Sequence, residues 1–375
     1  MLALMTTVAA GQPIRPQEPV EPFPYRVERV LIDASDEGID DGVWSVSSGG
    51  PTHVLGATLT IPDAGEFGEG PYPGVVLMTG SGAQDRDSAV MGHKPFFVLA
   101  DFLTRHGFSV LRFDDRGVGE STGIFGTTSV EGHGHDGWVA ARWMMGRNEV
   151  DASRVGVMGH SQGGMLVPYV LAHDPELAFG VMLAGTGVSG AEVLADQTEL
   201  MYQKSMMSPE AIRGAIDARW MLFEKICAGA EQDELVEAST DIAMIEYSMT
   251  DRDEARKIGR SQLPQFTNIP LRSFICHDPR AWLVKVDVPV LAVNGSLDTQ
   301  VTPRLNLEGI RAALKESGNS QWTVIEFAGL NHLFQTAKTG TLGEYGAIQE
   351  TMSPRMMGLV GSWMSGVCVT PQSTD

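Results

Sequence analysis

Residues 155–164 read VGVMGHSQGG, an apolar β-strand pattern that runs directly into a G-x-S-x-G motif. A helical pattern follows at once. A strand, this motif and a helix together predict a very tight turn that lifts the hydroxyl of Ser161 above the strand ends, beside the positive end of the helix. Glycine is expected at 159 and 163 because side chains there would collide with the neighbouring strand and helix. Ser161 is therefore a candidate nucleophile.

A serine hydroxyl needs a base, and the base needs an acid that orients it. In this arrangement both residues follow the serine, acid first, each after a late strand. The apolar run 288–293 predicts a buried strand that leads to Asp298, and the strand pattern at 322–327 leads to His332. The order and placement predict a triad of Ser161, Asp298 and His332.

A negative oxygen formed at the serine would need hydrogen-bond donors. The run PGVVLMT predicts a strand and leads into the glycine-rich sequence GSGAQDRD. Such a turn can present backbone N–H groups to a developing oxyanion. One donor is expected from Gln162 and the other from Ser81, with Gly82 as the alternative. Asp85 and Arg86 are expected to brace this loop by ion pairing.

Three other histidines near the motifs are expected to have structural and not catalytic roles. His160 is next to the serine, but the tight turn points it elsewhere, so it is interpreted as a packing residue. His133 and His135 lie close to Asp136 on or before a helical stretch, without a further group of ligand-type residues. No metal site is therefore predicted there.

The rest of the chain follows a strand–helix rhythm. Alternating apolar and polar residues over 25–33 and 53–62 predict an antiparallel pair at a sheet edge. Further strand patterns alternate with helical stretches, near residues 75–79, 109–114, 154–158, 179–184, 288–293 and 322–327. This rhythm predicts an α/β fold with a mostly parallel sheet covered by helices on both faces. Each candidate catalytic residue then follows a strand at its carboxyl end, where such sheets place their sites.

The rhythm stops over 186–279, where the pattern is helical throughout and Ser208 followed by proline predicts a helix start. We interpret this stretch as a helical cap inserted into a core formed by 25–185 and 280–375. Residues 1–24 are interpreted as an arm or residual export signal with a linker. The apolar stripe expected in the cap comprises Ile212, Ile216, Trp220 and Phe223.

Three motifs occur in order: GSGAQDRD at 80–87, DDRGVGES at 114–121 and GLNHLFQ at 329–335. Together with GHSQGG they resemble the bacterial carboxylesterases among the serine hydrolases of α/β-hydrolase fold. The resemblance extends from about residue 25 to the last residue. One position departs from it, because Thr79 stands where many relatives have histidine; backbone donors form the oxyanion hole, so only the outer shape of the loop is expected to differ.

The resemblance implies acyl transfer on an ester of small to medium size. His332 would take the proton of Ser161 as the hydroxyl attacks the ester carbonyl, and Asp298 would hold the imidazole in the required tautomer. Water would then hydrolyse the acyl-enzyme. The resemblance implies no metal and no organic cofactor, and a small-molecule ester as the partner.

Other functions compete with this one. A serine peptidase, for example an aminopeptidase, or an acyltransferase could use the same triad. A peptidase of that kind needs an acidic site for the substrate amine, for which Glu224, Asp233 and Glu234 are available in the cap. A non-catalytic binding protein on this fold is disfavoured by the intact triad, and dehalogenase chemistry by a serine where that reaction needs an aspartate.

Composition limits the partners and the compartment. A net charge of −20 argues against nucleic acid and anionic membranes, and no apolar run approaches the roughly 20 residues needed to span a bilayer. The three cysteines, at 227, 276 and 368, are interpreted as packing residues because they are too few for a disulfide framework. The apolar stretch 2–10 ends in small residues but lacks a basic start, so export is favoured and a cytoplasmic enzyme is the alternative.

Overall fold

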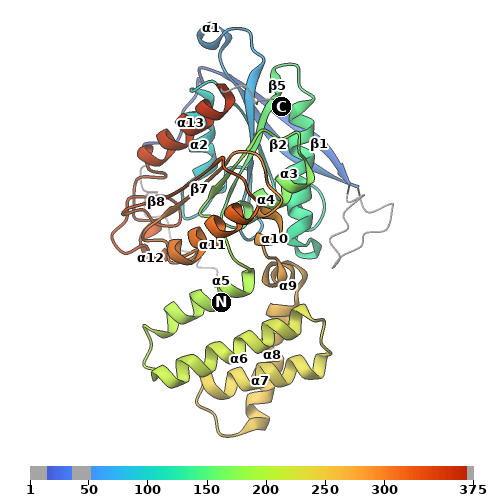
Figure 1. The fold of residues 1–375 in the computed structure, drawn as a ribbon, viewed down its shortest axis with the longest axis vertical. Coiled ribbons are helices and arrows are strands. Elements are labelled where there is room, and N and C mark those ends of the chain that lie inside the picture. Colours follow the sequence, from blue (N-terminus) through green and yellow to red (C-terminus); the bar gives the residue numbers. More distant parts are fainter. Residues whose placement is uncertain (1–14, 36–51, 370–375) are drawn as a thin grey trace.

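The computed structural model describes residues 15–35 and 52–369 and is built on one eight-stranded sheet (Figure 1). The strand order is β1-β2-β4-β3-β5-β6-β7-β8. β2 pairs antiparallel with β1 and β4, and the other neighbours pair parallel. The strands are β1 (Arg26–Ser35), β2 (Thr52–Ile61), β3 (Tyr72–Met78), β4 (Ser109–Phe113), β5 (Val150–His160), β6 (Phe179–Leu183), β7 (Val290–Gly295) and β8 (Trp322–Phe327). The predicted α/β fold and its antiparallel edge pair are confirmed.

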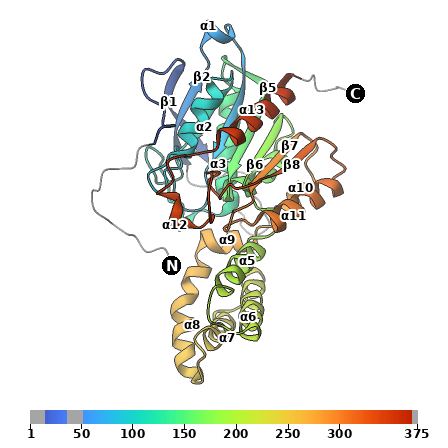
Figure 2. The same ribbon diagram turned by 90° about the vertical axis from the view of Figure 1, so that its left-hand side faces the viewer.

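Both faces of the sheet are buried. Along β3, Val75 and Leu77 pack into one apolar cluster, whereas Val76 and Met78 pack into another on the opposite face, as the two-residue period of a strand requires. The first face is covered by α2 (Pro95–Thr104) and α13 (Pro354–Val369), and the second by α3 (Val130–Met145), α4 (Gln162–His173), α10 (Arg280–Leu283) and α11 (Pro303–Glu316) (Figures 1 and 2). Short helical turns are α1 (Ala64–Phe67), η1 (Phe125–Thr127) and α12 (Leu342–Tyr345).

Five helices between β6 and β7 project beyond one end of the sheet (Figures 1 and 2). They are α5 (Gly190–Tyr202), α6 (Pro209–Cys227), α7 (Gln232–Glu246), α8 (Arg252–Thr267) and α9 (Ile269–Cys276). These helices share an apolar core of their own. The predicted start of α6 is confirmed, because the Ser208 side chain accepts from the backbone of Ala211.

The apolar stripe of α6 differs in part from the prediction. Phe223 is fully buried, but Ile212, Ile216 and Trp220 are only partly covered. The buried face of the helix instead comprises Ala215, Ala218, Leu222, Phe223 and Ile226. Helical spacing alone gives two adjacent faces in this sequence, and the packing of α7 and α9 decides which of them is covered.

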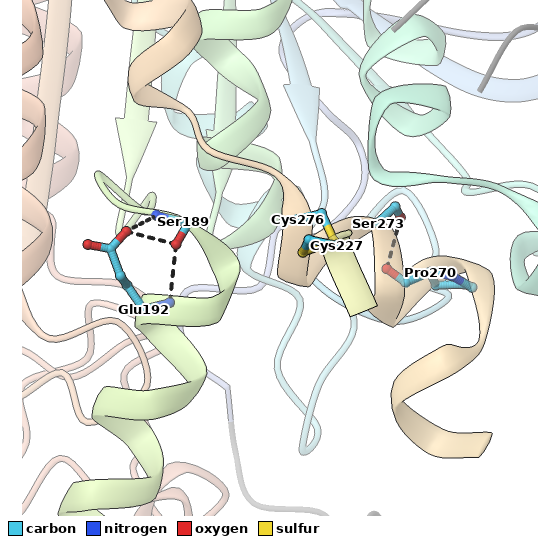
Figure 3. The surroundings of a disulfide bond; sticks show 6 residues. All are labelled: Ser189, Glu192, Cys227, Pro270, Ser273 and Cys276. Carbon is cyan, nitrogen blue, oxygen red and sulfur yellow. Dashed lines mark hydrogen bonds between the residues drawn. A yellow bond between two sulfur atoms is a disulfide. The ribbon is translucent and has the colours of Figure 1, made fainter. Parts of the chain in front are cut away.

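Cys227 and Cys276 form a disulfide, so their interpretation as simple packing residues is wrong. The bond joins the last residue of α6 to the last residue of α9 (Figure 3). On α9, the Ser273 hydroxyl donates to the Pro270 carbonyl and accepts from the backbone N–H of Val130 on α3. The disulfide therefore ties the outer helices to the helix that leads back to the sheet.

Replacing both cysteines, Cys227→Ser with Cys276→Ser, is expected to lower stability by roughly 4 kcal/mol, because the bond closes a loop across 49 residues of chain. Thermal unfolding of the double variant, and of the wild type with and without a reductant, measures this. Cys368→Ser, which removes the free cysteine, is the control and should leave Tm close to that of the wild type. Equal Tm values for oxidised and reduced wild type would contradict the expectation.

Candidate active site

Ser161 lies at the turn between β5 and α4 with φ 56° and ψ −118°, a left-handed conformation that is strained for a residue with a side chain. The two glycines of the motif make this turn possible. A Cβ on Gly159 would lie 2.1 Å from the carbonyl oxygen of Gly163, and a Cβ on Gly163 would lie 2.3 Å from that of Met78. The steric reason predicted for both glycines is confirmed.

The turn is fixed on two sides. The backbone N–H of Ser161 donates to the Leu183 carbonyl at the end of β6, at 2.9 Å. On the other side, a Cβ built on Gly80 would lie 3.2 Å from the Ser161 Cβ, so the turn after β3 lies directly against the serine. Gln162 is the first residue of α4, which places the positive end of that helix at the same point.

Asp298 and His332 are hydrogen-bonded to each other. The His332 Nδ1–H donates to the Asp298 Oδ2 at 2.7 Å, and both side chains are almost fully buried. The other oxygen, Oδ1, accepts the backbone N–H groups of Gln300 and Val301 at 2.8 and 2.9 Å. Because both carboxylate oxygens accept hydrogen bonds and Oδ2 takes the Nδ1–H, the imidazole is held in the tautomer whose Nε2 can accept a proton.

The loops that carry these two residues are joined by backbone hydrogen bonds. The N–H of Leu297 donates to the Leu330 carbonyl, and the N–H of Ser296 donates to the Phe327 carbonyl, both at 2.9 Å. The hydroxyl of Ser296 accepts the N–H of Gly329, also at 2.9 Å. The relative position of acid and base therefore follows from the parallel pairing of β7 and β8.

His160 connects the serine turn to the histidine loop. Its Nε2 donates to the backbone carbonyl of His332 at 2.8 Å, and the two rings lie 4.7 Å apart between centroids. Burial, with a smaller effect from the neighbouring His332, lowers the pKa of His160 to about 3. A neutral imidazole is thus fixed next to Ser161, which agrees with a packing role and adds a positioning contact that the sequence did not reveal.

The loop after β3 contains the predicted oxyanion donors. Ser81 and Gly82 are exposed, and Gly82 has φ 88°, a conformation that favours glycine. Arg86 braces the far end of this loop as predicted, since its guanidinium binds both Asp114 and Glu120. Asp85 forms no ion pair with any residue that the structure describes, so the pairing expected for it is not observed.

The Asp85 carboxylate instead accepts the backbone N–H groups of Asp87 and Ala89, at 3.1 and 3.0 Å. It therefore caps a local turn. Sequence reasoning could not separate these two roles, because an aspartate beside an arginine satisfies both patterns.

Asp136, which was considered as a metal ligand with His133 and His135, binds an arginine and a different histidine. Its buried carboxylate accepts from the Arg116 guanidinium at 2.7 and 2.8 Å and contacts the His53 Nε2 at 2.8 Å. Within residues 15–35 and 52–369, no group of three or more His, Cys, Asp or Glu residues is placed to hold a metal ion. In the same ranges no helix is long and apolar enough to cross a bilayer.

The first inserted helix contacts the loop of the candidate acid. On α5, Gln197 donates to the Gln300 carbonyl at 2.7 Å, and Asp196 accepts from the Thr302 hydroxyl at 2.8 Å. The same residue, Gln300, donates its N–H to Asp298. The insertion is therefore attached to the loop that carries the candidate acid.

The sheet order, the serine turn and the two later loops define an α/β-hydrolase. Within that class the chain belongs to the S15 family, described as X-Pro dipeptidyl-peptidase, whose model matches residues 50–317.

Individual proteins similar to the chain include an esterase. Esterase EstD of Thermotoga maritima is 28% identical over 281 residues, which cover 74% of this chain and 58% of that protein. The chain thus spans less than two thirds of that relative's length. Solved structures with the same fold include the Pyrococcus furiosus esterase Pf2001, at 13% identity and a TM-score of 0.51 over 91% of this chain and 90% of that one. A hypothetical protein, PA2218 of Pseudomonas aeruginosa, gives 15% identity and a TM-score of 0.55 over 97% and 99%.

Proposed function

We propose that the chain is a serine carboxylic ester hydrolase that acts through an acyl-enzyme on small to medium acyl esters. The observation that carries the proposal is the buried 2.7 Å bond between His332 and Asp298, on loops fixed against the strained turn of Ser161. The similarity to an esterase over most of this chain supports the ester substrate.

In this proposal the Ser161 hydroxyl attacks the ester carbonyl while His332 Nε2 takes its proton. The charge that forms on the imidazole is stabilised by the Asp298 carboxylate. Backbone N–H groups of Gln162 and of Ser81, or Gly82 in its place, donate to the tetrahedral oxyanion. The alcohol leaves with the proton from His332, and water repeats the sequence to release the acid.

The inserted helices over 186–279 are proposed to form a cap above this site. Their place at the carboxyl end of the sheet supports this role (Figure 1), as do the contacts of α5 with the loop of Asp298. A cap limits access and excludes water, which favours small substrates over a polymer. The disulfide between these helices supports the proposal that the enzyme is exported, because disulfides persist in oxidising compartments. The stretch 2–10, on which the prediction of export rests, lies outside the described residues.

A serine peptidase is the second candidate, and the description of the S15 family as X-Pro dipeptidyl-peptidase favours it. Its substrate amine would need carboxylates near the serine. The three cap residues considered for this, Glu224, Asp233 and Glu234, are exposed on α6 and α7, which lie away from the sheet (Figure 1). This placement favours the esterase.

Two substrate series separate the candidates. Nitrophenyl esters from acetate to laurate and X-Pro nitroanilides are assayed side by side at matched enzyme concentration. We expect ester hydrolysis with the highest kcat/KM on short acyl chains and no cleavage of the anilides. Cleavage of the X-Pro anilides by a chain that leaves every ester intact would replace the esterase with the peptidase.

A further inference from the structure

Asp115 holds both ends of the turn that contains the proposed oxyanion donors. Its Oδ1 accepts from the hydroxyl of Thr79 at 2.7 Å, and its Oδ2 accepts the backbone N–H of Gln84 at 2.8 Å. The Asp115 N–H in turn donates to the Gln84 carbonyl at 3.1 Å. The four residues between these attachment points are 80–83.

Within the described part of the chain, residues 80–83 have few other contacts that could hold them near the serine. Gly80 lies against Ser161, whereas Ser81, Gly82 and Ala83 are exposed to solvent. Inside the turn, the Gln84 side chain donates to the Ser81 carbonyl at 3.0 Å. A backbone N–H that must meet an oxyanion has to be held in position before the reaction, since a small misplacement weakens the bond it makes.

Burying a carboxylate at this position is unfavourable, because a buried charge loses its hydration. Asp115 is 6% exposed, and its two side-chain partners are a hydroxyl and an N–H group, both neutral. Burial is the largest influence and raises the pKa of Asp115 to about 7. The nearby charges belong to ion pairs of their own, Asp114 with Arg86 and Asp136 with Arg116.

The raised pKa has a consequence for stability. Between a pKa of about 4 in the unfolded chain and the raised pKa in the folded protein, the folded protein keeps a proton that the unfolded chain has released. Stability from this residue is therefore present at acid pH and is lost as the pH rises toward 7. Ionisation of a buried group that works against folding is more typical of functional positions than of an ordinary core.

We propose that Asp115 is a positioning residue for the reaction, because its carboxylate fixes the turn 80–83 with its N–H groups toward the oxyanion formed at Ser161. The inference rests on the proposed function and adds a residue to it. Asp115 touches no reacting atom, so its effect should appear in the stabilisation of the transition state and leave substrate binding almost unchanged.

Asp115→Ala removes both attachments and is expected to lower kcat for nitrophenyl acetate about 10- to 100-fold, with KM little changed, since complete loss of one oxyanion donor costs about 10²–10³. Affinity for phenylboronic acid, whose adduct with serine is tetrahedral, should fall in parallel with kcat/KM. Asp115→Asn can accept from Gln84 and donate to Thr79, so kcat should stay within about threefold of the wild type and Tm at pH 8 should not fall.

Asp174→Asn is the matched control. That carboxylate is also buried and lies after the opposite end of α4, where it binds Trp138 and Arg142. It should lower Tm and leave kcat and boronate affinity unchanged. Where Asp115→Ala does not yield folded protein, Thr79→Val removes one attachment, and a fall of about 3- to 10-fold in kcat is expected.

Wild-type kcat and boronate affinity in Asp115→Ala, or in Thr79→Val where that variant replaces it, would overturn the inference. A fall in kcat in Asp115→Asn as large as that in Asp115→Ala would also overturn it, because asparagine keeps both hydrogen bonds and the effect would then not come from their loss. Failure of the proposed function has a different signature, namely a wild type that is inactive on every ester or an activity that survives loss of Ser161.

Discussion

Replacing Ser161 with alanine is expected to reduce kcat for ester hydrolysis by about 10⁴–10⁶ while the protein stays folded. The hydroxyl is the group that would form the acyl-enzyme, and its removal leaves only the oxyanion donors and substrate binding. Initial rates on nitrophenyl acetate for both proteins, with circular dichroism and Tm measured in parallel, check the expectation.

Ser153→Ala is the control for this substitution. Ser153 lies on the same strand as the serine turn but is exposed and bound to Asp151. Its replacement should leave the rate unchanged. Turnover in the Ser161→Ala protein close to that of the wild type would remove Ser161 from the site.

The second large effect is expected for Asp298→Asn, with a loss in kcat of about 10³–10⁴. Asparagine can offer its NH₂ group where the carboxylate accepted the His332 Nδ1–H. The imidazole proton would then move to Nε2, which could no longer take the proton of the serine. The rates of the wild type and the variant are measured over a pH series and compared with each protein at its own pH optimum.

Asp287→Asn is the corresponding control, because Asp287 is exposed and lies just before β7, the strand that leads to Asp298. We expect no change in rate from it. A silent Asp298→Asn, with another carboxylate near β7 or β8 proving essential, would show that the acid was misassigned.

The fold and the serine turn could be predicted because their physical requirements are local. Gly159 and Gly163 are needed at fixed offsets from the serine, and the observed close approaches at both positions show why. The apolar runs of β3, β4, β6 and β7 are short, contiguous and buried on both faces, a pattern that parallel sheets require. Asp298 and His332 could be proposed because parallel strands bring their carboxyl ends to one edge.

Features that depend on long-range contacts could not be predicted. Cys227 and Cys276 are far apart in the chain, and no spacing rule pairs two helix ends. Asp115 belongs to the motif DDRGVGES, but its proposed role depends on hydrogen bonds to a loop more than thirty residues earlier in the chain. The contact from His160 to His332 likewise exists only once the two loops have met.

Labelling with a fluorophosphonate, followed by digestion and mass spectrometry, shows which side chain is the nucleophile. A single adduct on Ser161 is expected, absent from Ser161→Ala and formed much more slowly by Asp298→Asn. An adduct on another residue, or no adduct on a protein that hydrolyses esters, would contradict the assignment of Ser161 as the nucleophile.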